Sequence, residues 1–178
     1  GAARVTSPSK LTAFSGSSLN GAVRAPGDKS ISHRALIFGG MAHGVTEIEG
    51  LLEGDDILAT GRAMQALGAK VERIGEGRWR VTGTNGALSS PANVIDCGNA
   101  GTGVRLLMGA AAGHELTATF DGDASLRKRP MARGTKPLSD MGARFDWNAT
   151  EDRLPLTLHG GALKGMVYEQ TVASAQIK

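Results

Sequence analysis

Cysteine, aromatic side chains and long apolar runs are all scarce in this 178-residue chain. The one cysteine, Cys97, excludes an intrachain disulfide and a zinc site built from several cysteines, and we expect its thiol to pack in the core rather than act as a nucleophile. A single cysteine is typical of a reducing compartment, so a cytoplasmic location is expected. Without a run of about 18 apolar residues, a membrane is not an expected partner.

Strong charge is also missing, which argues against nucleic acid as a partner. The formal net charge is +3, and only one Tyr, four Phe and two Trp could stack on bases. The four histidines show no metal-ligand spacing, so we expect neither a metal nor another cofactor.

Glycine, by contrast, is abundant, at 26 of 178 residues against a usual ~7%. Glycines and their neighbours divide the first part of the chain into short elements. A helix is expected after Pro26-Gly27, capped by Asp28 or a nearby serine and stopped at Gly39-Gly40. The other expected elements are a strand at 19–25, a strand at 45–48, a helix at 57–67 ending at Gly68, and strands at 70–74 and 79–82.

The same order of elements begins again near residue 94. A strand at 94–97 is expected to run into a glycine-rich turn at 98–103 and a helix through Ala112. Later segments also match between the copies: 43–46 with 113–117, 54–56 with 122–124, 67–69 with 141–143, and 81–83 with 158–160. The sequence therefore predicts two copies of a βαβαββ unit, the second with an inserted basic loop at 127–130.

A regular interval predicts a third unit, because Ser30, Thr102 and Ser174 lie 72 residues apart at corresponding helix starts. One helical turn is not stable alone, so we expect the chain to be part of a larger protein. If the units are related by pseudo-threefold symmetry, their first helices are parallel and their N-termini face one site. The expected organisation is an N-terminal segment at 1–20, a first unit at 21–90, a second at 91–165 and the start of a third at 166–178.

The first helix start has the residue types of an anion site. A helix N-terminus stabilises an anion by roughly 0.3–1 kcal/mol before any side chain contributes. Lys29 lies at the helix mouth, while Ser30 and Arg34 are four apart and share one face. Together they offer an ammonium, a hydroxyl and a guanidinium to one phosphate. The alternative is that Ser30 only caps the helix and that both cations are solvated.

The second helix start also allows two interpretations. Residues 98–103 read G-x-x-G-x-G, which is neither a dinucleotide nor a P-loop fingerprint. Gly101 would let a ligand approach the backbone, with Asn99 beside it as a neutral donor and acceptor. The turn could instead be a plain glycine-rich connection, and the basic loop a solvated surface.

Six blocks of the chain stand out, and the first, third and fifth of them are together highly specific. They lie at 26–34, 51–56, 98–103, 121–126, 128–131 and 173–178. In these blocks the chain closely resembles the 5-enolpyruvylshikimate-3-phosphate synthase family, from about residue 19 to its last residue. The resemblance implies an α/β fold, an inside-out barrel of two lobes with three βαβαββ units each, of which this chain would hold an incomplete part.

The resemblance also implies an activity, the transfer of the enolpyruvyl group of phosphoenolpyruvate to the 5-hydroxyl of shikimate 3-phosphate, with release of phosphate. This reaction belongs to the shikimate pathway of aromatic amino acid biosynthesis. Lys29 would contact both substrates, Ser30 and Arg34 would hold shikimate 3-phosphate, and Gly101 and Arg129 would bind phosphoenolpyruvate. The full set of substrate-binding residues expected here is Lys29, Ser30, Arg34, Asn99, Gly101, Arg129, Ser174 (at the shikimate phosphate) and Gln176 (between the ligands).

The family's acid and base carboxylates lie beyond Lys178, so no catalytic residue is expected here and the complementary C-terminal part of the enzyme is an expected partner. Asp55 and Asp56 are expected to cap a helix. Residues 133–136 depart from the family's more apolar link, which leaves the path after the basic loop open. The resemblance also implies sensitivity to the herbicide glyphosate, since in the family an alanine at the position of Gly101 crowds out the inhibitor.

Two rival functions stay open. The sister enolpyruvyl transferase that acts on UDP-N-acetylglucosamine shares the fold and the donor, although the Asp-Lys-Ser-x-Ser-x-Arg block at 28–34 argues against it. The other rival is a non-catalytic fragment that binds a phosphorylated ligand or a partner chain. A turnover assay that offers each acceptor would distinguish these two rivals from the expected activity.

Overall fold

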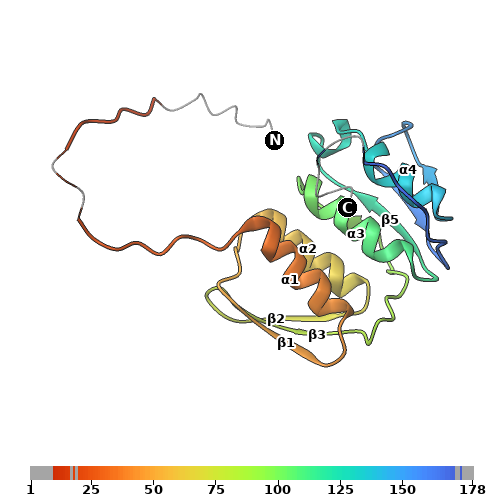
Figure 1. Cartoon of the computed structure of the whole chain (residues 1–178), viewed down its shortest axis with the longest axis horizontal. Helices are drawn as coiled ribbons and strands as arrows, with labels where there is room; N and C mark the ends of the chain where they lie inside the picture. Colours follow the sequence, from red (N-terminus) through yellow and green to blue (C-terminus); the bar gives the residue numbers. More distant parts are fainter. Residues whose placement is uncertain (1–9, 17, 19, 171–172, 174–178) are drawn as a thin grey trace.

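The computed structural model describes residues 10–16, 18, 20–170 and 173 as a mixed α/β fold with two β-sheets (Figure 1). Ser174 and Gln176 lie outside these residues, as does nearly all of the expected third unit. In the part that the structure describes, no helix has the length and apolar character needed to cross a membrane. The unit boundaries expected from the sequence stay predictions.

The first half of the fold packs two helices against one face of a three-stranded sheet (Figure 1). Its elements are α1 (Lys29–Met41), β1 (Val45–Glu49), α2 (Asp55–Ala66), β2 (Lys70–Gly75) and β3 (Arg78–Thr82). The strands are antiparallel in the order β1-β3-β2. Leu36 of α1, Met64 of α2 and Val81 of β3 are almost fully buried, and each contributes about 1.5–3 kcal/mol to the common core.

The second half repeats this arrangement around a four-stranded sheet. Its elements are β4 (Ile95–Asp96), α3 (Gly101–Ala112), β5 (Thr117–Asp121), the 3₁₀ turn η1 (Leu126–Lys128), α4 (Ala132–Asp140), β6 (Arg144–Trp147) and β7 (Leu156–His159). The strand order is β4-β5-β7-β6, and β4 pairs parallel to β5. Leu107, Phe120 and Leu158 are fully buried and join α3 to this sheet.

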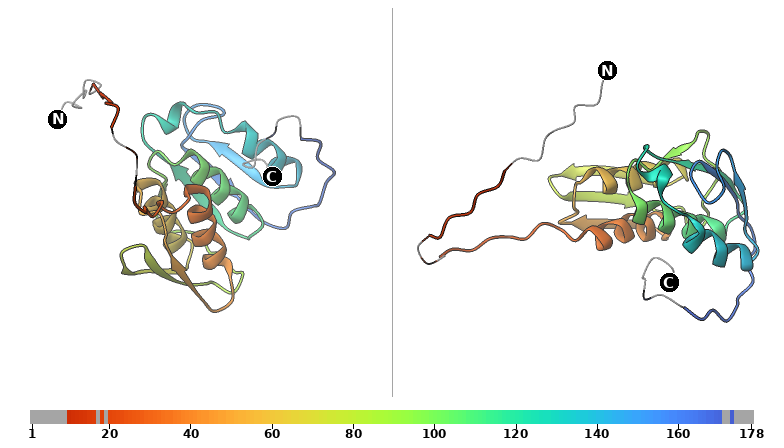
Figure 2. Two further views of the ribbon diagram at one scale, coloured as in Figure 1. Left: turned by 60° about the vertical axis from the view of Figure 1, so that its left-hand side comes forward. Right: turned by 90° about the horizontal axis from the view of Figure 1, so that it is seen from above.

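Helices α1 and α3 lie side by side and run in the same direction, so both N-termini lie at the same end of the molecule (Figures 1 and 2). Gly103 allows this close packing. A Cβ atom at Gly103 would lie 2.8 Å from the Thr60 hydroxyl oxygen and 3.1 Å from Cε1 of His33. The parallel first helices expected for the two units are therefore present.

The prediction of a strand at 19–25 is wrong for the residues of this segment that the structure describes. Residues 20–25 form no strand, and Val23 is 96% exposed on a segment that extends away from the fold (Figure 1). Alternating apolar residues and β-branched residues form a strand only where the edge of a neighbouring strand pairs with them. In the described part of the chain, no strand pairs with residues 20–25.

The helix stop expected at Gly39-Gly40 is also wrong, because α1 continues to Met41. Both glycines face inward, and a Cβ at Gly40 would lie 2.5 Å from the Met64 methyl group. Here glycine permits close packing of α1 on α2 and does not end the helix. The other expected elements of the first half are confirmed, including the end of α2 before Gly68, whose φ of +112° suits glycine.

Candidate functional site

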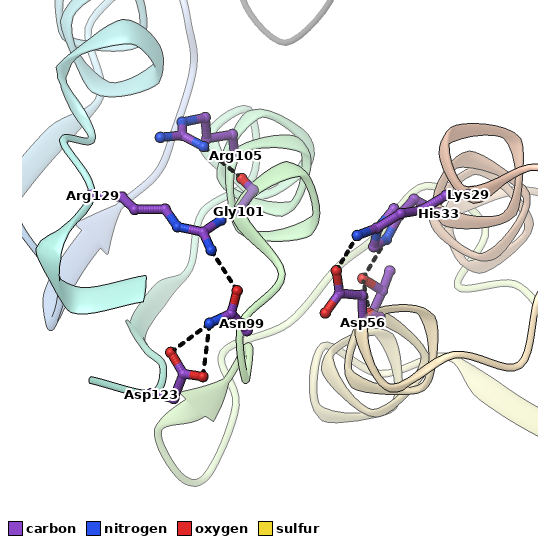
Figure 3. Close-up of polar contacts among 9 residues, drawn as sticks. Lys29, His33, Asp56, Asn99, Gly101, Arg105, Asp123 and Arg129 are labelled. Carbon is purple, nitrogen blue, oxygen red and sulfur yellow. Dashed lines mark hydrogen bonds and ion pairs between the residues drawn. The ribbon is translucent and has the colours of Figure 1, made fainter. Parts of the chain in front are cut away.

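The start of α1 carries a cation that is already paired. Asp28 caps the helix, since its carboxylate accepts a hydrogen bond from the backbone N–H of Ile31 at 2.7 Å. Lys29, the next residue, forms an ion pair with Asp56 in the first turn of α2 (Figure 3). The side chain of Lys29 is 53% exposed and that of Asp56 is 21% exposed. An incoming anion could therefore reach the ammonium by replacing this carboxylate.

Ser30 and Arg34 lie one turn apart on the outer side of α1. Ser30 is exposed and Arg34 is partly buried, and the Arg34 guanidinium donates to the Ser30 carbonyl at 3.1 Å. The shared helix face expected for these two residues is confirmed. The role in substrate binding that the sequence assigned to Lys29, Ser30 and Arg34 stays a prediction.

Sequence reasoning missed a buried histidine beneath Lys29. His33 is 0% exposed, and its Nδ1 lies 2.8 Å from the Thr60 hydroxyl. Burial, followed by the nearby charge of Lys29, lowers the pKa of His33, so the imidazole is neutral at pH 7. Its Nε2 is buried without a hydrogen-bond partner among the described residues. The only sequence signal was its helical spacing from Leu36 and Ile37, which places a polar residue on the apolar face.

The start of α3 differs, because Ala100 at its N-cap position provides no side-chain hydrogen bond. Gly101 is the first helical residue and is buried. A Cβ at Gly101 would lie 2.7 Å from a terminal nitrogen of Arg129 and 3.2 Å from one of Arg105. Two guanidinium groups therefore lie directly against this helix start.

The two arginines of the basic loop have different kinds of partner. Arg127 forms a two-pronged ion pair with Asp121, which lowers the pKa of that carboxyl group. Arg129 instead donates to the neutral Asn99 side chain at 2.5 Å. Asn99 in turn donates to both carboxylate oxygens of Asp123, at 3.0 and 2.9 Å (Figure 3). Asn99 thus orients Arg129 without neutralising its charge.

Arg105 links the helix start to the end of the basic loop. One terminal nitrogen donates to the Gly101 carbonyl at 2.9 Å and the other to the Pro130 carbonyl at 2.8 Å. Its Nε is buried without a partner in the described residues. Sequence reasoning missed Arg105, because nothing local shows that its side chain reaches a loop 25 residues away.

The path after the basic loop, which the sequence left open, is helix α4. Its start is held by Asp152, whose carboxylate accepts from the backbone N–H groups of Met131 at 2.7 Å and Ala132 at 2.5 Å. The loop is therefore tied down at both ends, by Asp121 before Arg129 and by Asp152 after it.

The two groups of cations face each other across the starts of α1 and α3. In Figure 3 the Lys29–Asp56 pair lies on one side and the Arg129–Asn99 pair on the other, with their charged ends pointing inward. No group of three or more metal-ligating side chains occurs among the described residues. The expectation that Cys97 packs in the core is confirmed, since the residue is 1% exposed and burial raises the pKa of its thiol to about 12.

Comparison with known proteins agrees with this architecture. Residues 14–178 match the family model of EPSP synthase (3-phosphoshikimate 1-carboxyvinyltransferase). The 3-phosphoshikimate 1-carboxyvinyltransferase of Caulobacter vibrioides is 60% identical over 94% of this chain and 38% of that protein. The protein of the same name from Phenylobacterium zucineum is 62% identical over 94% of this chain and 37% of its own length. The chain therefore spans less than two-fifths of these relatives.

Solved structures show the same likeness. The EPSP synthase of Acinetobacter baumannii superposes with a TM-score of 0.83 at 42% identity, over 89% of this chain and 36% of that one. The expected fold class, an incomplete inside-out α/β barrel of enolpyruvyl transferase type, is confirmed. By its sequence and its fold, the chain belongs to the EPSP synthase family.

Proposed function

We propose that the protein containing this chain transfers the enolpyruvyl group of phosphoenolpyruvate to the 5-hydroxyl of shikimate 3-phosphate and releases phosphate. The chain supplies the N-terminal half-site, which binds and aligns the two substrates. The proposal rests on the family match and on one observation, the two groups of cations at the adjacent starts of α1 and α3. A cytoplasmic location is part of this proposal and is supported by the single reduced cysteine.

The chemistry requires such an arrangement because both substrates are anions that repel each other. Bringing them into contact costs free energy unless fixed positive groups lie beside each, and alignment of two reactants can supply about 7–11 kcal/mol of the barrier. Cations and helix N-termini that are oriented before binding stabilise charge without reorganisation. Charge compensation and alignment are therefore the tasks of this half-site.

Each helix start takes one anion in this proposal. At α1, Ser30 and Arg34 hold the phosphate of shikimate 3-phosphate, and Lys29 leaves Asp56 to bridge both substrates. At α3, Gly101 and Arg129 bind phosphoenolpyruvate, with Asn99 as a neutral partner. Ser174 and Gln176, outside the described residues, complete the expected set.

Proton transfer is assigned to the complementary C-terminal part of the enzyme. Two carboxylates near the site have structural partners that substrate binding does not displace, since Asp28 caps α1 and Asp123 binds Asn99. The chain alone is therefore expected to bind substrates without turning them over.

The test combines this chain with a separately produced C-terminal part and both substrates, and measures phosphate release. The intact enzyme in the same buffer is the positive control, and each part alone is the negative control. Release by the mixture supports the proposal. No release, with an active intact enzyme, would refute the half-site description.

The same assay separates the rival functions. Turnover with UDP-N-acetylglucosamine in place of shikimate 3-phosphate would identify the sister transferase activity. Substrate binding without turnover by the intact enzyme would instead identify a non-catalytic, phosphate-binding protein.

A further inference from the structure

Arg105 occupies an unusual position for an arginine, because its guanidinium binds backbone carbonyls and forms no hydrogen bond with a carboxylate of the described residues. It leaves α3 one turn after Gly101, and its two terminal nitrogens donate to the carbonyls of Gly101 and Pro130. Pro130 directly follows Arg129, so this bond fixes the backbone next to the residue whose guanidinium lies against Gly101. A planar guanidinium can hold two carbonyls at once, which a lysine ammonium on a flexible stem does less well.

This position costs the folded chain electrostatic energy. Burial, and then the positive charges of Arg129 and Arg133, lower the pKa of Arg105 from its ordinary value. Its buried Nε makes no hydrogen bond within the described residues, and an unsatisfied buried donor is itself unfavourable. A merely structural link between two carbonyls could be made without crowding like charges. The crowding is relieved when an anion binds beside Arg129.

We infer that Arg105 is a positioning residue for phosphoenolpyruvate, which holds Arg129 against the start of α3 by tying the Gly101 and Pro130 carbonyls together. The inference rests on the proposed function and adds a residue to it. Arg105 acts through Arg129 and the loop backbone, and its contacts to Gly101 and Pro130 leave shikimate 3-phosphate at the α1 start untouched. Loss of Arg105 therefore affects one substrate far more than the other.

The experiment uses the complete enzyme that contains this chain, as wild type and as the variants Arg105→Met, Arg105→Lys and Arg133→Met. Arg133 is the matched control, because it is an exposed arginine that adds charge near Arg105. The KM for each substrate, kcat, the Kd for shikimate 3-phosphate and Tm are measured for every variant.

Arg105→Met is expected to raise the KM for phosphoenolpyruvate by about 10- to 100-fold, since a small misplacement of a binding group has effects of this size. The Kd for shikimate 3-phosphate should change by less than about twofold, because distant sites act independently. Arg105→Lys should recover part of the loss, and Arg133→Met should change the KM by less than about fivefold.

Four outcomes would overturn the inference. Equal effects of Arg105→Met and Arg133→Met would mean that only net charge matters. Equal loss of both substrates, together with a lower Tm, would identify an ordinary structural residue. If the wild type is active and Arg105→Met has an unchanged KM for phosphoenolpyruvate, the inference alone is refuted. If the wild type shows no turnover, the proposed function is refuted and the inference with it.

Discussion

The starts of α1 and α3 hold their cations in two different ways. At α1 the helix is capped by Asp28 and the ammonium of Lys29 is neutralised by Asp56. At α3 no side chain caps the helix, and the guanidinium of Arg129 donates to the neutral Asn99. Under the proposed function, the first site must exchange an ion pair when it binds an anion, whereas the second gains a countercharge.

This difference predicts different responses to mutation. At α3 the loss of Arg129 should weaken binding directly, because its guanidinium donates to the neutral Asn99 and forms no ion pair that an anion must displace within the described residues. At α1 removal of the competing carboxylate should strengthen binding. Three substitutions test this contrast, in order of decreasing expected effect, and a fourth tests the stability of the half that contains α1.

The largest effect is expected for Arg129→Ala. The variant should lower kcat/KM for phosphoenolpyruvate by about 10²–10³-fold, the usual cost of removing an oriented charge donor. Lys128→Ala, which removes an exposed cation next to it in the loop, is the matched control and should have little effect. Comparable loss of shikimate 3-phosphate binding in Arg129→Ala would remove the assignment of this arginine to one substrate.

Gly101→Ala should weaken glyphosate inhibition by about tenfold or more, because overpacking of this kind costs about 1–3 kcal/mol. The added methyl group would lie 2.7 Å from an Arg129 nitrogen, so the guanidinium must move. Gly109→Ala on the same helix is the control, since its Cβ meets nothing within 4 Å. Inhibition constants decide the matter, and equal values for wild type and Gly101→Ala would contradict the prediction.

Asp56→Asn should tighten binding of shikimate 3-phosphate by up to about fivefold, the typical upper worth of a partly exposed ion pair. The substitution frees Lys29 from its carboxylate while keeping the size of the side chain. Asp55→Asn removes a charge from the same first turn of α2 without touching Lys29, and should leave the Kd unchanged. Calorimetric titration measures both; weaker binding by Asp56→Asn would show that the carboxylate orients the ammonium instead of competing for it.

The smallest effect concerns stability on the α1 side. Glu53 accepts hydrogen bonds from Arg73, Trp79 and the Gly77 backbone, and the pair with Arg73 is the main cause that lowers its pKa from 4.5 to about 2. A lowered carboxyl pKa stabilises the fold above the unfolded value, and this stability is lost as the pH falls from about 4.5 to about 2.

Wild type should therefore lose about 2–4 °C more in Tm than Glu53→Gln when the pH is lowered from 6 to 3. Glu49→Gln, in the neighbouring strand β1, is a suitable control. Thermal melts at the two pH values measure the difference, and parallel curves for wild type and Glu53→Gln would rule out this carboxylate as the source.

Local signals in the sequence predicted most of the helices and strands. Asp28 before an apolar helical pattern, and Gly68 after one, mark helix ends through bonds that close within a few residues. The helix stop expected at Gly40 was wrong because the role of this glycine is not local. It lets Met64 of another helix approach. The expected strand before Asp28 failed because pairing depends on an edge that no local pattern specifies.

The candidate site divides in the same way. Lys29 and Arg129 could be singled out because they lie in conspicuous segments, a helix mouth and a basic loop. His33 and Arg105 could not, because their contacts span 27 and 25 residues and exist only after the helices have packed. Residues that position others through such contacts leave little trace in a single sequence.

Gly103 has a consequence for redesign. Because its missing side chain brings α3 to the Thr60 hydroxyl and the His33 ring, the separation of the two cation groups is set at this helix crossing, away from the cations themselves. Any larger residue at 103 would act as a spacer that moves one binding end relative to the other. A search for variants that accept acceptors of different length should therefore begin at this crossing.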